Sequence, residues 1–174
     1  MTHPAAALDA QIADLIASCY DNPLKYVLAV WPWGEPGPLE RSQGPDAWQR
    51  QFLIDLGEEV KRRPFDGLHP VLPIRMAVAS AYGVGKTALA AWIIHWIMDT
   101  RPDAKGTITA NTFTQLEDKT WAAVQYWGKL KINAEWLTVT SSLMYEPHAR
   151  ESWKCSPQSC REENSEALDR KSVV

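Results

Sequence analysis

The residues of this chain that could do chemistry gather in one short stretch, Ser80-Ala81-Tyr82-Gly83-Val84-Gly85-Lys86-Thr87. The stretch matches the phosphate-binding pattern G-x-x-x-x-G-K-[ST] at every position except the first, where Ser80 replaces glycine. Gly83 and Gly85 allow backbone N–H groups to turn inward towards phosphate oxygens, in conformations that disfavour a Cβ atom. Lys86 supplies positive charge for the β- and γ-phosphates, and Thr87 places a hydroxyl for Mg²⁺. We therefore expect ATP and Mg²⁺ to bind here.

The loop is flanked by the two elements that a phosphate site of this kind needs. Residues 74–80, IRMAVAS, are short and apolar, which predicts a buried parallel strand. A helix is predicted from Lys86 to about Met98, and the positive end of its dipole would face the bound anion. Ser80 departs little from the pattern, because a small residue can also end a strand and begin the turn. A Gly-rich turn without a ligand is the alternative, and the flanking elements disfavour it.

Three segments precede this loop. Apolar residues at helical spacing predict an amphipathic helix over residues 5–19. Prolines and glycines are dense over residues 26–46, so we expect an extended, loop-rich arm there. Asp46 is a predicted N-cap for the next helix, which Pro64 ends.

Beyond the loop, strand and helix patterns alternate. Strands are predicted at residues 106–111, in the region 136–146 and at 152–156, and a helix at 112–130. Alternation of this kind predicts an α/β fold with a parallel sheet flanked by helices. A domain of this type needs about five strands, so we expect the sheet to be incomplete at its C-terminal side.

Composition sets the broad class. With 174 residues the chain is long enough for one domain with a core, but short for two. No apolar run reaches the length of a membrane span and no signal-peptide pattern opens the chain, so we expect no membrane contact and a cytoplasmic location. Its net charge of −3 means that any DNA contact would need a local basic patch or further protein. Three cysteines without a CxxC pair favour reduced thiols over a metal site.

One partner of the phosphate loop is missing from the sequence. ATP hydrolysis of this type uses an apolar strand ending in Asp-Glu, whose Asp helps to hold Mg²⁺ and whose Glu polarises the attacking water. No such strand follows Leu137, and the acidic residues beyond it lie in polar segments typical of solvated surface charge. We therefore expect this chain to bind a nucleotide and to turn it over weakly or not at all.

The order of the motifs resembles a known family. IRMAVASAYGVGKTALAAWIIHW and TITANTFTQLEDKTWAAVQYW, with the upstream PLKYVLAVWPWGEPGPLE and GPDAWQRQFL, are similar to the ATPase domain of tailed-phage large terminase subunits. The resemblance covers about residues 21–167. It implies a P-loop NTPase fold and an ATP-driven motor that threads double-stranded DNA into the capsid. It also implies a homo-oligomeric ring, a portal protein and a small terminase subunit as partners, and the cytoplasm of a host cell.

The resemblance assigns roles to single residues. The loop would hold the ATP phosphates, with Lys86 as the catalytic residue and Thr87 as the metal ligand. Gln49, on a W-Q-x-x-[FL] helix, would read the adenine edge, with an exposed helical glutamine as an equal alternative. Asn111 and Thr112 would contact phosphate or couple hydrolysis to DNA movement, with strand-end capping as the alternative.

The sequence also departs from the family in its charges. Many large terminases carry an Arg within the phosphate loop that stabilises transition-state charge, and the loop of this chain holds none. Arg75 lies at the far end of the predicted strand, so it is a poor substitute.

The end of the chain departs from the resemblance at Leu168. Residues 169–174, Asp-Arg-Lys-Ser-Val-Val, are what a common sequencing adapter encodes in one frame before a stop codon. We therefore expect a non-native tail at 169–174, after an N-terminal helical and loop arm at 1–63 and a partial ATPase core at 64–168. Two other functions stay open: a helicase or helicase loader, which the TANT and WPWG segments disfavour, and a nucleotide-binding module without catalysis.

Overall fold

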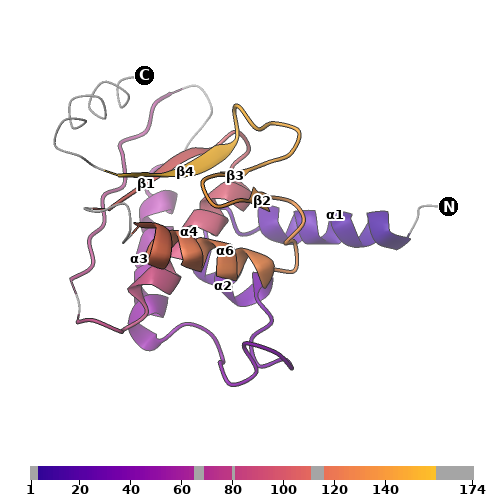
Figure 1. The fold of residues 1–174 in the computed structure, drawn as a ribbon. Helices are drawn as coiled ribbons and strands as arrows, with labels where there is room; N and C mark the ends of the chain where they lie inside the picture. The colour runs from indigo at the N-terminus through magenta and orange to yellow at the C-terminus, as the bar shows by residue number, and fades with distance from the viewer. Residues whose placement is uncertain (1–3, 65–68, 80, 111–115, 160–174) are drawn as a thin grey trace.

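The computed structural model describes residues 4–64, 69–79, 81–110 and 116–159. They form an α/β protein whose helices pack against a small sheet of mixed strand direction (Figure 1). The elements in chain order are α1 (Pro4–Ala17), α2 (Pro23–Val30), α3 (Ala47–Lys61), α4 (Lys86–Thr100), β1 (Lys105–Ala110), η1 (Leu116–Trp121, a π-helical turn), α6 (Ala122–Lys129), β2 (Thr138–Val139), β3 (Met144–Tyr145) and β4 (Lys154–Ser159). The predicted α/β class is confirmed at this level.

The helix α2 was not predicted, because the loop-rich arm was expected to begin at residue 26. Asn22 caps this helix by accepting a hydrogen bond from the Lys25 N–H at 2.9 Å, and Pro23 occupies its first turn. Its apolar face, with Tyr26 and Val27 fully buried, packs into the core. The prolines and glycines break regular structure only after Val30, so the expectation was wrong for residues 26–30.

The helix α3 begins where the sequence predicts. Asp46 stands at its N-cap, and the side-chain Oε1 of Gln49 accepts a hydrogen bond from the Asp46 backbone N–H at 2.8 Å. This contact satisfies a backbone donor at the start of the helix, as in a capping box. The helix ends at Lys61, shortly before Pro64.

The helix α4 lies at the centre of the molecule and is covered on two sides (Figure 1). One side packs Trp92 and Trp96 against α1, α2 and α3 in the first core cluster. The other side packs Ala91 and Met98 against η1, α6 and the sheet in the second cluster. The helix α4 is therefore held in place by helices and sheet together, and the loop precedes its first residue.

The sheet has the strand order β1-β4-β3-β2. The strands β1 and β4 pair in parallel, whereas β4 with β3 and β3 with β2 pair antiparallel. The predicted strands at 106–111 and 152–156 correspond to β1 and β4. The third strand region, 136–146, is a short hairpin of β2 and β3 instead of one strand, and the predicted parallel sheet is therefore present only in part.

Residues 74–79 do not form the predicted buried strand. They run without regular secondary structure and expose Met76 and Val78, which are 36% and 38% accessible. Ile74 and Met76 line an apolar cavity of about 330 Å³ beside α3 and α4. A strand forms only where a neighbour receives its backbone hydrogen bonds, and no described strand pairs with this segment.

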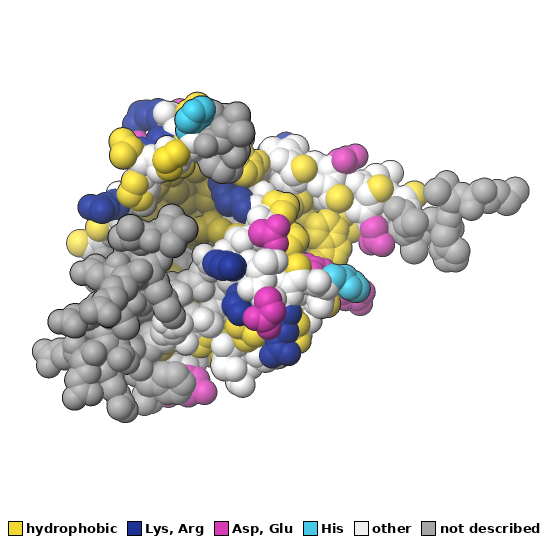
Figure 2. Space-filling view, turned by 90° about the horizontal axis from the view of Figure 1, so that it is seen from above, with side chains coloured by type: hydrophobic (Ala, Val, Ile, Leu, Met, Phe, Trp, Pro, Cys, Tyr) yellow, Lys and Arg dark blue, Asp and Glu magenta, His cyan; other side chains and the backbone are white. Residues whose placement is uncertain are grey.

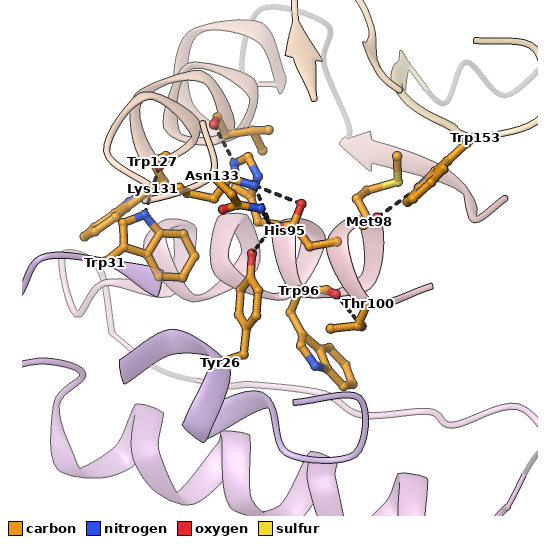
Figure 3. A network of polar contacts seen from close by, with 12 residues as sticks. Tyr26, Trp31, His95, Trp96, Met98, Thr100, Trp127, Lys131, Asn133 and Trp153 are labelled. Atoms are coloured by element: carbon orange, nitrogen blue, oxygen red, sulfur yellow. Dashed lines mark hydrogen bonds and ion pairs between the residues drawn. The ribbon is translucent and has the colours of Figure 1, made fainter. Parts of the chain in front are cut away.

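A buried polar network ties α2 and α4 to the segment that follows α6 (Figure 3). The Asp99 carboxylate accepts hydrogen bonds from Tyr26 Oη at 2.6 Å, Lys131 Nζ at 2.7 and 2.9 Å, and Asn133 Nδ2 at 2.8 Å. The side chains of Lys131 and Asp99 are 1% and 0% exposed. Burial and the adjacent Asp99 raise the pKa of Tyr26 well above its usual value, so the phenol stays a hydrogen-bond donor.

The surface is mixed in character. Figure 2 shows hydrophobic side chains at the floor of a hollow, with acidic and basic side chains interspersed on the surface around it. None of the helices within the described residues combines the length and the hydrophobicity that a bilayer crossing requires. Residues 160–174, which include the predicted tail at 169–174, lie outside the described residues.

Candidate functional site

The backbone of the loop has the shape that its glycines predict. Gly83 has φ 83° and Gly85 has φ 85°, both in the left-handed region that residues with a Cβ atom rarely adopt. Gly85 is also the N-cap of α4, so the helix begins at Lys86. The loop thus turns directly into a helix N-terminus, where backbone N–H groups without a helical partner favour an anion.

Gln49 connects α3 to this loop. Its side-chain Nε2 donates a hydrogen bond to the Gly85 backbone oxygen at 3.0 Å, and the residue is only 4% exposed. A Cβ atom added to Gly85 would lie 2.7 Å from that Nε2 atom, so a larger residue would displace the Gln49 amide, and the φ of 85° independently favours glycine. With Oε1 bonded to Asp46, both ends of the Gln49 amide are occupied by the protein backbone.

The Lys86 side chain lies back over the loop. Its Nζ atom donates a hydrogen bond to the Ala81 backbone oxygen at 2.6 Å, while the residue stays exposed to solvent. Thr87, in the first turn of α4, is half-buried and lines the same cavity as Lys86. A phosphate oxygen would offer the Lys86 ammonium a stronger hydrogen bond than a neutral carbonyl does, because both partners are then charged.

The loop encloses one side of a cavity of about 360 Å³. The residues that line it are Tyr82, Gly83, Val84, Gly85, Lys86, Thr87 and Lys119. Two of these described residues are cations and none is a carboxylate, so the cavity suits an anionic ligand. For Mg²⁺ the lining offers the Thr87 and Tyr82 hydroxyls, which fits an ion held mainly by phosphates and water.

Not all predicted site residues can be placed. Ser80, Asn111 and Thr112 lie outside the described residues. Arg75 is exposed on the segment 69–79 and does not line the loop cavity.

Lys119, which the sequence did not single out, does line this cavity. Its position in the chain could have indicated it, because Lys119 follows the predicted strand at 106–111. The carboxyl ends of such strands face the ligand cleft in α/β folds. No motif spacing marked that lysine among its polar neighbours.

A third cavity, of about 350 Å³, has a different chemistry. Its lining includes Asp99, Glu135 and Glu146, so it would repel a polyphosphate. In the described part of the chain, no three or more His, Cys, Asp or Glu residues are placed to hold a metal ion. Cys19 and Cys155 are buried free thiols, and burial raises the pKa of Cys155 to about 11, which keeps it protonated and unreactive.

Comparisons with protein-family models, with curated proteins and with solved structures return no match. We therefore infer the function from the loop, its cavity and the motif order of the sequence.

Proposed function

We propose that this chain is the ATP-binding part of a DNA-packaging motor, a terminase large subunit that couples ATP hydrolysis to the movement of viral DNA into a capsid. The observation that carries ATP binding is the loop itself: two left-handed glycines, the start of α4 and the Lys86 amine face one cavity whose described lining residues include no carboxylate. The packaging role, in a ring with portal protein and small subunit in the host cytoplasm, is proposed from the motif order.

Each residue of the site has a proposed task. The backbone N–H groups of Gly83 and Gly85 would donate to phosphate oxygens, and Lys86 would leave the Ala81 carbonyl to bind the outer phosphates. The Thr87 hydroxyl would ligate Mg²⁺, which neutralises phosphate charge when it binds with the nucleotide. Adenine recognition by Gln49 stays a prediction, as do the roles of Asn111 and Thr112.

A second candidate function is nucleotide binding without turnover. It is favoured by the absence of a carboxylate among the described residues that line the loop cavity, since hydrolysis needs a group that activates water. In this chain the loop would then grip a nucleotide, and another segment or subunit would supply the carboxylate.

Calorimetric titration of the whole chain with Mg-ATP tests the proposal. We expect Lys86→Ala to weaken ATP binding by about tenfold or more, because a charge-assisted hydrogen bond is lost. The matched control is Lys129→Ala, an exposed lysine of α6 that does not line the cavity, and it should bind ATP as the wild type does.

Absence of ATP binding by a folded wild-type chain would overturn the proposal. Phosphate release should be weak or absent in the same samples, and robust Lys86-dependent release would overturn the non-catalytic reading. The packaging assignment has a separate test in the source genome, where a portal-protein gene should lie just downstream. Replication genes at that place would favour a helicase or helicase loader.

A further inference from the structure

Lys119 belongs to a part of the chain that is firmly anchored. The π-helical turn η1 buries Leu116 and Trp121 at its two ends, with 0% and 1% exposure. The Trp121 side-chain N–H donates to the Thr140 backbone oxygen at 2.8 Å. These contacts fix the turn against the sheet side of the core, and Lys119, between the anchors, is exposed. π-helical turns of this kind occur often at functional sites.

The Lys119 amine faces the loop. Its Nζ atom lies 5.8 Å from the centroid of the Tyr82 ring, and the residue lines the same cavity as Lys86. Tyr82 is 92% exposed, so its ring offers a weak, solvated contact that an anionic ligand can replace. No ion pair among the described residues involves Lys119.

The cavity therefore has two amines on separate elements, one on α4 and one on η1. Between Ala81 and Thr87 the loop itself carries Lys86 as its only cation. A nucleoside triphosphate keeps a net negative charge even with Mg²⁺ bound, and a second amine at the same cavity would offset part of that charge. Lysine suits a second contact of this kind, because its flexible stem carries a point charge that needs no fixed orientation.

We propose that Lys119 is a second phosphate-binding residue, which moves from the Tyr82 ring to the phosphate chain of the nucleotide held by the loop. The inference rests on the proposed nucleotide binding and deepens it, since it assigns the positive charge that the loop does not carry. This contact would connect the turn η1, which packs against the sheet, to the phosphates of the bound nucleotide.

The experiment titrates the whole chain with Mg-ATP, with inorganic tripolyphosphate and with adenosine. We expect Lys119→Ala to weaken both ATP and tripolyphosphate by about tenfold, while Lys119→Arg keeps the charge and most of the affinity. Adenosine binding should not change, because the lost contact is to phosphate. Lys129→Ala is the matched surface control.

The outcomes separate the two proposals. A wild type that binds ATP in a Lys86-dependent way, with Lys119→Ala equal to wild type, would overturn the role of Lys119 and leave the proposed function standing. No ATP binding by the folded wild type would overturn both. Equal loss for adenosine and tripolyphosphate would point to a structural effect and would also overturn the phosphate contact. Far-UV circular dichroism and thermal unfolding verify the fold of each variant, and Lys119→Gln provides a second neutral replacement.

Discussion

Gln49 carries two hydrogen bonds at once, and each fixes a different part of the candidate site. Its Oε1 atom accepts from the Asp46 N–H at the start of α3, and its Nε2 atom donates to the Gly85 carbonyl at the start of α4. The residue therefore joins two helix N-termini and holds the loop at the position where α4 begins. This arrangement favours a positioning role for Gln49 over direct contact with adenine.

Replacing Gln49 separates these two roles. Gln49→Glu keeps an acceptor for Asp46 but loses the donor to Gly85 and places negative charge beside the loop. We expect it to cost about 1–3 kcal/mol of unfolding free energy and to weaken ATP, GTP and tripolyphosphate alike. Urea unfolding and calorimetry measure both effects, with the exposed Gln51→Glu on the same helix as control. A selective change in the ATP-to-GTP ratio would instead support adenine reading.

For single residues, the sequence predicts the features that depend on local backbone chemistry. The glycines, Lys86 and the N-cap Asp46 follow from patterns with a short-range cause, and the structure has them in the predicted shape. The tether from Gln49 to Gly85 and the position of Lys119 depend on how α3 and η1 pack, which residue spacing does not encode. Such contacts become visible only when the elements are assembled.

The helices are held together by the buried Asp99–Lys131 ion pair as well as by the two hydrophobic clusters. Asp99 of α4 receives hydrogen bonds from α2 and from the segment after α6, all within the core. Removing one partner of a buried ion pair leaves the other charge without compensation, which costs more than the pair itself contributes.

Lys131→Met tests this network. The ammonium is lost while Asp99 stays buried, so we expect a decrease of about 3–5 kcal/mol in the free energy of unfolding. Lys129→Met, two positions away and exposed, should change it by less than about 0.5 kcal/mol. The double variant Asp99→Asn/Lys131→Met should recover part of the loss, because it removes the unpaired charge. If Lys131→Met and Lys129→Met change the free energy of unfolding equally in urea, the Asp99–Lys131 pair does not stabilise the fold.

A helix can be predicted from its own residues, whereas a strand can be predicted only where a neighbouring strand also forms. The strand β1 and the helices α1, α3 and α4 follow from apolar periodicity and capping residues, and they form as predicted. Residues 74–79 have the composition of a strand, but a strand also requires a neighbour, and the described residues provide none. The helix α2 is the opposite case, because it forms where none was predicted. Asn22 and Pro23 start it, whereas the prolines that follow Val30 led to the prediction of an irregular arm.

The stability of the whole molecule should depend on pH through one histidine in its centre. His95 of α4 is fully buried, and its Nε2 atom donates to the Val124 carbonyl at 2.9 Å, since a carbonyl can only accept. Its buried Nδ1 atom has no hydrogen-bond partner among the residues that the structure describes. Burial, aided by the nearby Lys131 charge and opposed by Asp99, lowers the pKa of His95 to about 3.

A folded-state pKa far below the unfolded value of about 6.5 fixes the sign of the effect. Below pH 6.5 the unfolded chain binds a proton that the folded chain excludes, so the contribution of His95 is complete above that pH and is lost as pH falls towards about 3. Between about pH 7.5 and about pH 5, where carboxylates stay ionised, we expect a loss of about 2 kcal/mol in the free energy of unfolding. Urea unfolding at the two pH values measures it. His95→Gln, which keeps a donor for Val124, should remove most of this dependence, whereas the exposed His148→Gln should retain it. If the pH dependence is the same in both variants, His95 is not its source.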